Sequence, residues 1–308
     1  MKNLPPEICV IEAPCKINLH LKIGEKRPDG FHALESLFAS LGLHDTLCFE
    51  KAEGEGESRL TTNWEIPGEI IKNNLVLKAV SLFREETGFK TSLKVRLDKR
   101  IPPGSGLGGG SSDAASSLLA LNLLSGSPLP EEKLEKMAAF LGSDVPFFLS
   151  GGAAHVTGRG EAVKKVKPLE NLWVVLVKPP FSSNTAGAFR LFDQAGEGNG
   201  AVFRGNAPSR ELSGEELTRA LDGNPETWPF YNDFLSIFDD SIHSIINSLK
   251  EKGASFAGLS GSGTCCFGVF KAKETAEKAA KELSCPGTFV KLSFFLAHRV
   301  NPVVQLRS

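Results

Sequence analysis

The sequence has little of what marks a secreted, disulfide-stabilised or zinc-binding protein. Its six cysteines form no C-x-x-C pair and show no cysteine and histidine spacing suited to zinc. No stretch approaches the roughly 18 apolar residues of a membrane span, and the first residues, MKNLPPEICVIEAPCK, lack the apolar run of a secretory signal. We therefore expect a cytoplasmic protein with reduced thiols and no membrane partner.

The chain also lacks an excess of charge of either sign. Lys and Arg number 35 against 36 Asp and Glu, so the formal net charge is -1. Such a chain has no overall field that would gather nucleic acid, and any phosphate that it binds must be held by a local site. With 308 residues, 41% of them hydrophobic, the chain is long enough for about two domains with a core each.

Short-range patterns predict a mixture of strands and helices without a regular alternation. Strict alternation of apolar and polar residues predicts half-buried strands at 16–23 and 93–98, and an apolar run predicts a buried strand at 172–177. Helical periodicity or an apolar run predicts helices at 113–124, 131–141 and 240–250. These elements favour an α+β fold over a doubly wound sheet, with one domain at 1–167 and a second at 168–308.

Three segments have the composition of turns or loops. RPDGFH at 27–32 has turn chemistry, and a glycine- and asparagine-rich stretch at 195–208 is typical of a mobile loop. A glycine cluster, GLSGSGTCCFG at 258–268, is either a tight turn or a lid over a site in the first domain.

The segment PPGSGLGGGSSDAA at 102–115 places five glycines between a strand and a helix. Glycines let a ligand approach the main-chain N–H groups, and the start of a helix adds unpaired donors and a partial positive charge. Such a loop binds phosphate, whereas a flexible linker would not run directly into an apolar helix that Ser111 or Ser112 can cap. The predicted phosphate loop comprises Pro102, Pro103, Gly104, Ser105, Gly106, Leu107, Gly108, Gly109, Gly110, Ser111 and Ser112.

Other nucleotide-binding patterns fit this segment less well. Its glycines satisfy G-x-G-x-x-G, but a dinucleotide fingerprint normally follows the first strand of a βαβ unit, and here about a hundred residues come first. The sequence has no G-x-x-x-x-G-K-[ST] and no H-R-D or D-F-G set. The P-loop and protein-kinase classes are therefore disfavoured.

The loop resembles the P-x-x-x-G-L-G-G-G-S-S motif of the GHMP superfamily, named for galactokinase, homoserine kinase, mevalonate kinase and phosphomevalonate kinase. Three further segments, at 13–38, 142–149 and 258–268, look like the 4-diphosphocytidyl-2-C-methyl-D-erythritol kinase family. This resemblance implies an N-terminal domain similar to domain 2 of ribosomal protein S5 and a ferredoxin-like C-terminal domain. It also implies ATP with Mg²⁺ as phosphoryl donor, and the 2-hydroxyl of a cytidine-diphosphate-linked methylerythritol as acceptor.

The resemblance assigns the catalytic roles to two residues. Asp144 would accept the proton of the hydroxyl, although the sequence alone makes it equally a helix N-cap ahead of Pro146. Lys16 would offset charge on the transferring phosphoryl group, although an exposed strand lysine is usually solvated. Ser112 would contact phosphate or Mg²⁺, or only cap its helix. No carboxylate is assigned as a metal ligand.

The resemblance also implies a pocket for the cytosine ring. His32 would bond the edge of the base while two aromatic rings stack on its faces, and the remaining members are polar: the set is Asn18, Phe31, His32, Thr185 and Phe189. Without the resemblance, both phenylalanines would be assigned to the core. The family usually has tyrosine at position 31 and alanine where this chain has Cys15.

Two alternatives remain open at this point. A sister kinase for mevalonate or homoserine would keep the glycine loop but would have no use for a cytosine pocket. A non-catalytic nucleotide-binding module would keep the fold but would not need both Lys16 and Asp144. The sequence leaves the oligomeric state open.

Overall fold

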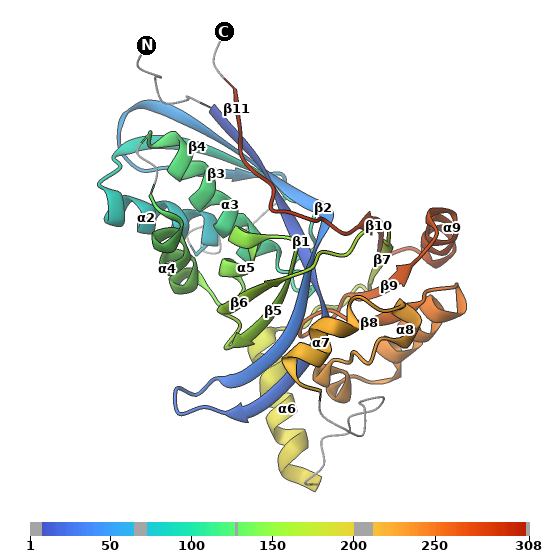
Figure 1. Cartoon of the computed structure of the whole chain (residues 1–308). Helices are drawn as coiled ribbons and strands as arrows, with labels where there is room; N and C mark the ends of the chain where they lie inside the picture. Colours follow the sequence, from blue (N-terminus) through green and yellow to red (C-terminus); the bar gives the residue numbers. More distant parts are fainter. Residues whose placement is uncertain (1–7, 65–72, 127–128, 200–211, 306–308) are drawn as a thin grey trace.

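The structure is a computed structural model that describes residues 8–64, 73–126, 129–199 and 212–305 (Figure 1). The larger of its two sheets has the strand order β11-β1-β2-β4-β3, and β5 and β6 continue it from β2. These strands are β1 (Ile8–Lys26), β2 (His32–Glu55), β3 (Arg59–Thr62), β4 (Thr91–Asp98), β5 (Ala153–Gly158), β6 (Ala162–Val166) and β11 (Val303–Gln305). The predicted strand at 93–98 lies in β4, and the predicted turn at 27–32 joins β1 to β2.

Four helices cover one face of this sheet: α2 (Leu75–Thr87), α3 (Gly109–Leu124), α4 (Glu131–Leu141) and α5 (Val145–Ser150). The helix α3 is central, as predicted, because its apolar residues are buried on nearly all sides. It packs against α2, α5 and β1, and its Leu118 and Leu121 belong to one core with Phe49 and Phe83. The first domain therefore holds its glycine loop against a rigid layer.

The smaller sheet has the strand order β10-β7-β9-β8, formed by β7 (Trp173–Lys178), β8 (Phe256–Leu259), β9 (Cys266–Phe270) and β10 (Phe289–Phe294). The helices α8 (Asp240–Glu251) and α9 (Lys273–Leu283) pack on it. The sequence of these elements, β7-α8-β8-β9-α9-β10, is the β-α-β-β-α-β order of a ferredoxin-like fold, as expected. Among the described strands only β3 and β4 pair in parallel, which confirms the α+β class.

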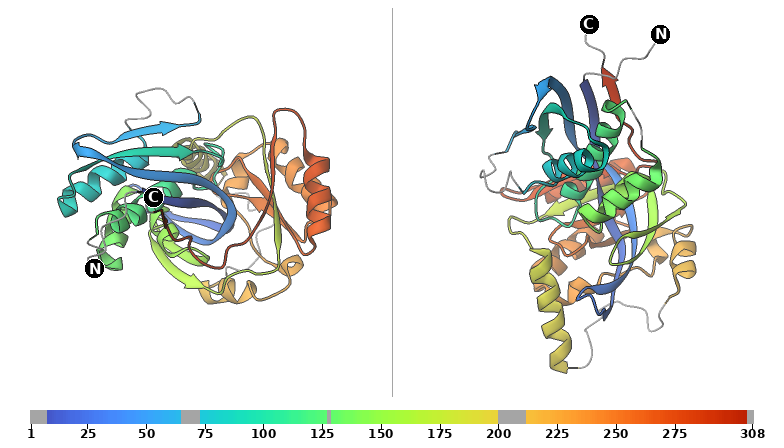
Figure 2. Two further views of the ribbon diagram at one scale, coloured as in Figure 1. Left: turned by 90° about the horizontal axis from the view of Figure 1, so that it is seen from above. Right: turned by 90° about the vertical axis from the view of Figure 1, so that its left-hand side faces the viewer.

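Between β7 and α8 the chain inserts α6 (Thr185–Asn199), α7 (Gly214–Ala220) and the 3₁₀ turns η1 (Pro225–Thr227) and η2 (Asp233–Ile237). The right-hand view of Figure 2 shows the lower end of α6 projecting from the molecule, while Ala188 and Phe192 pack the helix against Phe234 of η2. The expectation of a mobile loop from residue 195 is wrong for residues 195–199, because they end α6. Residues 200–208 lie outside the described part of the chain.

The strand predicted at 16–23 belongs to the much longer β1, and the prediction that it is half-buried is wrong. Lys16, Asn18 and His20, on its polar face, are as buried as Ile17 and Leu19 on its apolar face. The second domain packs on this strand, and Ile17 and Leu19 share a core with Phe267 of β9. Both faces of β1 are therefore buried at the junction of the domains.

The chain passes between the domains more than once. β6 ends at Val166 and β7 begins at Trp173, on either side of the predicted division at residue 167. The late strand β11 returns to the first sheet, where Val303 pairs with Val10 (Figure 1). In the described ranges no helix is long and apolar enough to cross a membrane.

Candidate active site

One cavity of about 1210 Å³ brings together the residues predicted from the sequence. Its walls come from β1, the glycine loop, the β1–β2 turn, the start of α2, the start of α6 and the loop between β8 and β9. All predicted site residues line it except Ser112. Residues more than 240 positions apart in the sequence therefore share one site.

The glycine loop takes a conformation that only glycine adopts readily. Gly104, Gly106 and Gly108 have φ angles of 59°, 76° and 72°, in the left-handed region. The loop carbonyl groups point into the protein: the oxygen of Gly106 accepts from the Ser260 hydroxyl at 3.0 Å, and that of Leu107 accepts from the Lys16 amide at 3.0 Å. The loop is thus anchored to both domains through its own main chain.

The helix α3 begins at Gly109, so the expectation that Ser111 or Ser112 is its N-cap is wrong. The N-cap is Gly108, which has no side chain to offer the first-turn N–H groups. Ser112 lies inside the helix, is fully buried and does not line the cavity, whereas Ser111 does. An uncapped helix start beside a glycine loop leaves main-chain donors for an anionic ligand.

Lys16 forms a buried cationic centre beside this loop. Its Nζ lies 3.4 Å from Oδ2 of Asp144, 2.5 Å from Oδ1 of Asn18 and 4.5 Å from the centre of the Phe38 ring. Asn18 in turn donates from Nδ2 to the Ser36 hydroxyl at 2.9 Å. With only 3% of Lys16 exposed, these contacts fix the ammonium group at one position in the cavity wall.

Asp144 occupies the N-cap position of α5, but its side chain makes no capping hydrogen bond. Its carboxylate is 32% exposed and lines the cavity, and it forms an ion pair with Lys16. The structure therefore lacks the hydrogen bond that would make Asp144 a helix cap. The carboxylate remains accessible to a group in the cavity.

At the other end of the cavity, the β1–β2 turn and α6 carry the residues predicted to hold a base. Phe31 is 51% exposed, and the guanidinium carbon of Arg159 lies 5.1 Å from the centre of its ring. The rings of His32 and Phe189 stack at 5.5 Å with 12° between their planes. Because Phe189 stacks on the ring of His32, the stacking of a base between Phe31 and Phe189 stays a prediction.

The glycine cluster at 258–268 is a hairpin between β8 and β9, and its loop packs on the glycine loop of the first domain. The Cys265 amide donates to the Ser105 carbonyl at 3.0 Å, beside the bond from Ser260 to Gly106. The hydroxyls of Thr185 and Ser262 lie 3.1 Å apart, so the start of α6 is tied to the same hairpin. The cluster is therefore a turn that packs on the glycine loop, and its role as a lid over a site stays a prediction.

Sequence reasoning missed an ionic cluster beneath the glycine loop. Lys99 Nζ contacts the carboxylates of Asp45 and Asp113, the latter at 2.8 Å, and Asp45 also accepts from the Ile101 amide at 2.8 Å. Burial raises the pKa of Asp113 to about 7, since the nearby Asp45 adds to the rise and Lys99 only partly opposes it. Burial alone would lower the pKa of Lys99, but the two carboxylates raise it. No pattern of spacing in the sequence joins these three residues.

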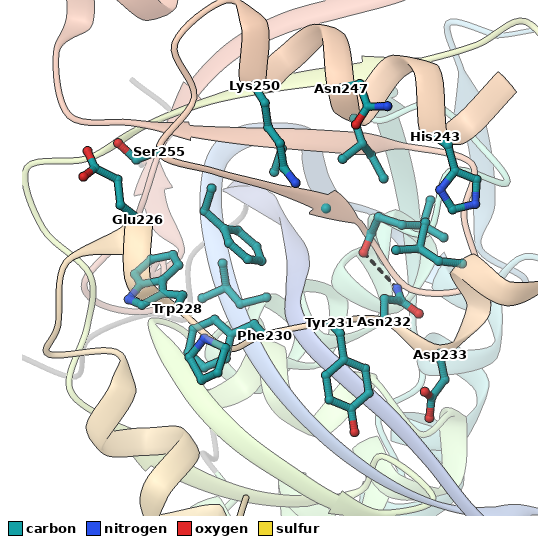
Figure 3. Close-up of a pocket in the computed structure, with 18 of the residues that line it drawn as sticks. Glu226, Trp228, Phe230, Tyr231, Asn232, Asp233, His243, Asn247, Lys250 and Ser255 are labelled. Carbon is teal, nitrogen blue, oxygen red and sulfur yellow. Dashed lines mark hydrogen bonds between the residues drawn. The ribbon is translucent and has the colours of Figure 1, made fainter. Parts of the chain in front are cut away.

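A second cavity, of about 500 Å³, lies in the C-terminal domain between α8, β8 and the segment that contains η1 and η2. Figure 3 shows His243, Asn247 and Lys250 reaching into it from α8, opposite Trp228 and Phe230. In the wall of this cavity, Asn232 donates from Nδ2 to the carbonyl of Leu259 at 2.8 Å (Figure 3). None of the predicted site residues lines this second cavity.

Comparison with known proteins identifies the class that this fold and glycine loop define. The family described as GHMP kinases N terminal domain matches residues 74–152, and the family described as GHMP kinases C terminal matches residues 235–288. The chain is thus a GHMP kinase.

More similar proteins narrow this class to one family. The chain is 35% identical to the 4-diphosphocytidyl-2-C-methyl-D-erythritol kinase of Prosthecochloris aestuarii, over 93% of this chain and 98% of that protein. It is 46% identical to the chloroplastic enzyme of that name from Oryza sativa, over 58% of this chain but only 45% of the rice protein. A crystal structure of 4-(cytidine 5'-diphospho)-2C-methyl-D-erythritol kinase matches with a TM-score of 0.72 and 31% identity, over 92% of this chain and 98% of that one. The chain belongs to the 4-diphosphocytidyl-2-C-methyl-D-erythritol kinase family.

Proposed function

We propose that the protein transfers the terminal phosphoryl group of ATP to the 2-hydroxyl of 4-diphosphocytidyl-2-C-methyl-D-erythritol, giving the 2-phosphate and ADP. The observation that carries this proposal is the single cavity in which a glycine loop, a Lys16–Asp144 pair and a histidine with aromatic neighbours meet. Phosphoryl transfer needs mainly positioning and charge stabilisation, and this cavity provides both.

Asp144 is the proposed general base. A carboxylate oxygen accepts the proton of the acceptor hydroxyl, so that the hydroxyl oxygen can form the new bond to phosphorus. Lys16 holds the carboxylate in place and presents a fixed positive charge to the oxygens of the transferring group. Asn18 positions Lys16, because its amide oxygen accepts from the ammonium group at 2.5 Å.

The glycine loop and the start of α3 are the proposed phosphate cradle. Gly108 places uncapped N–H groups at the cavity, and the helix adds a partial positive charge there. Mg²⁺ would shield the phosphate oxygens, and we propose Ser111 rather than the buried Ser112 as its side-chain ligand. In the part of the chain that is described, no three acidic, histidine or cysteine side chains form a metal cluster, so this ion would depend on the phosphates.

The aromatic end of the cavity is the proposed base pocket. Phe31, His32 and Phe189 provide π faces and a polar ring edge, while Thr185 lies at the wall that adjoins the hairpin. A kinase for mevalonate or homoserine would not need these groups. At the other end of the cavity, the pair of Lys16 and Asp144 argues against a non-catalytic nucleotide-binding module, because such a module would not need both residues.

ADP release over a panel of alcohol acceptors tests the proposal. The cytidine-diphosphate substrate should support turnover, while mevalonate and homoserine should give the rate of the no-acceptor blank. Turnover of mevalonate or homoserine without turnover of the cytidine-diphosphate substrate would contradict the acceptor and leave the kinase assignment standing.

A further inference from the structure

The segment that leads into the glycine loop is held by side chains and not by strand pairing. The last pair between β2 and β4 joins Thr46 to Asp98, where β4 ends. Residues 99–101 follow, and after them come Pro102 and Pro103, which have no N–H groups and cannot resume strand pairing. The N–H groups of residues 99–101 therefore need acceptors other than a neighbouring strand.

Asp45, the residue of β2 just before Thr46, accepts from two of these N–H groups. Its Oδ1 accepts from the Ile101 amide at 2.8 Å and also from the Arg100 amide. Asp45 is fully buried and does not line the site cavity, so it contacts the entry of the loop but no ligand in the cavity. One carboxylate oxygen thus fixes the first end of the glycine loop.

The other oxygen of Asp45 is connected to the second end of the loop through Lys99. Oδ2 of Asp45 contacts the Lys99 ammonium group, which also lies 2.8 Å from Oδ2 of Asp113 on α3. The two ends of the loop are in close contact, because a Cβ at Gly109, the first residue of α3, would lie 2.9 Å from Cγ2 of Ile101 and 3.4 Å from Nζ of Lys99. The same contacts therefore position the segment before the loop and the first turn of α3.

We propose that Asp45 is a positioning residue for nucleotide binding: it keeps the entry of the glycine loop and the start of α3 at the separation at which their N–H groups bind the same phosphates. This inference rests on the proposed phosphate cradle. A loop with left-handed glycines at Gly104, Gly106 and Gly108 has many conformations open to it, whereas anion binding needs several N–H donors to point at one place. Fixing both ends of the loop removes much of this freedom before the nucleotide binds, so less order has to be gained on binding.

The opposite effect would follow if Asp45 acted only through its charge. Asp45 and Asp113 place two acidic groups beside one ammonium group beneath the loop, and negative charge alone would weaken the binding of phosphate. Removing the charge of Asp45 should then strengthen ATP binding. The two interpretations therefore predict changes of opposite sign.

The test measures the dissociation constant of ATP by titration calorimetry, which needs no acceptor. In Asp45→Ala both amides lose their acceptor and Lys99 loses one partner, so ATP binding should weaken by about thirtyfold. In Asp45→Asn the side-chain oxygen still accepts from Arg100 and Ile101, so this variant should fold and bind ATP more weakly than the parent but within about fivefold of it. The dissociation constant of adenosine, which has no phosphate, should be the same in all three proteins.

Asp98→Ala is the matched control, because Asp98 is an exposed carboxylate that contacts the same segment only through the Arg100 side chain, at 3.5 Å, and does not line the cavity. It should keep the ATP affinity of the parent. Tighter ATP binding in Asp45→Asn overturns the inference in favour of the charge effect. Equal losses of ATP and adenosine affinity also overturn it, since general damage to the fold affects both ligands.

The measurement decides the question even where Asp45→Ala does not fold. In that case, an ATP dissociation constant of Asp45→Asn equal to that of the parent overturns this inference alone. A parent protein that does not bind ATP overturns the proposed function instead.

Discussion

The two ends of the site cavity are built in different ways. At the transfer end, main-chain bonds from Lys16 and the β8–β9 hairpin hold the glycine loop, and the Lys16 side chain is almost fully buried. At the base end, side chains on a turn and on α6 meet one another, and Phe31 is half exposed. A site with one rigid and one adaptable end separates two tasks: we expect changes at the first to alter rate and nucleotide binding, and changes at the second to alter acceptor affinity and choice.

The largest effect is expected from Asp144→Asn. Loss of the base should lower kcat by roughly 10²- to 10⁴-fold, with ATP affinity and melting temperature near the parent values. Asp144 makes no capping bond, so little stability should be lost. Steady-state kinetics and thermal unfolding measure both quantities.

Asp239→Asn is the control for this variant, because Asp239 is an exposed N-cap whose carboxylate does accept from the Ser241 amide, at 3.0 Å. It should leave kcat unchanged. If Asp144→Asn retained most of its turnover, Asp144 would be a positioning residue and not the base.

Gly108→Val should weaken ATP binding by about a hundredfold, or nearly 3 kcal/mol. The left-handed backbone at Gly108 is strained for a β-branched residue. A Cβ there would also lie 2.9 Å from Phe148 and 3.1 Å from Lys16. Titration calorimetry with ATP measures the loss.

Gly88→Val separates backbone strain from the role of the loop. Gly88 ends α2 with a φ of 71°, nearly that of Gly108, and a Cβ there would meet nothing within 4 Å. This variant should lose stability and keep its ATP affinity. Equal ATP affinities in the two folded variants would mean that the glycine loop is not the phosphate cradle.

The ionic cluster under the loop should make stability depend on pH. Asp113 has a pKa of about 7 when folded and an ordinary value of 3.8, so the folded state keeps a proton that the unfolded state releases between these values. Its contribution to stability is therefore lost as pH rises from 4 to 7. Relative to Asp113→Asn, the parent should lose about 2 kcal/mol of unfolding free energy between pH 5.5 and 8.

Urea unfolding of both proteins at the two pH values gives this difference. Burial lowers the pKa of His20 to about 4, which weakens both proteins equally in acid and cancels in the comparison. Identical pH dependence in the parent and in Asp113→Asn would show that the carboxyl group of Asp113 is already ionised in the folded state at pH 5.5.

The smallest effect is expected at the adaptable end. Phe31→Leu should cost about 1 kcal/mol of acceptor binding, or roughly fivefold in KM for the cytidine substrate, through loss of stacking. Phe31→Tyr should be nearly neutral, and neither should change KM for ATP. Phe140→Leu is the control, since Phe140 is 80% exposed on α4 and does not line the cavity. Equal losses for Leu and Tyr would place Phe31 outside the base pocket.

Local sequence patterns predicted helices and strands well. They did not predict the burial of a residue where that burial depends on a segment distant in the sequence. The helix at 131–141 begins and ends where its periodicity and Gly142 indicate. The burial of Lys16 and Asn18 could not be predicted, because it depends on segments distant in the sequence: Phe38 and Asp144 beside Lys16, and the β8–β9 hairpin beside Asn18. The start of α3 was misplaced because Gly109 and Gly110, poor helix formers by propensity, form its first turn.

The part of the site that belongs to sequence motifs could be predicted. The glycine loop, Lys16 and Asp144 were found through residue patterns and resemblance, and the fold brings them to one cavity. Asp113 is a single acidic residue within a helix, a pattern that usually indicates a solvated face.

The hydrogen bonds from the β8–β9 hairpin to the glycine loop also affect how ligands bind and dissociate. Parting the two domains like a hinge would break the contacts of Ser260 with Gly106 and of Cys265 with Ser105. We therefore expect the loop and the hairpin to move as one body through the catalytic cycle. We expect substrate and product to pass beside the turn that carries Phe31, so the residues of the proposed base pocket would also affect the rate at which the acceptor leaves.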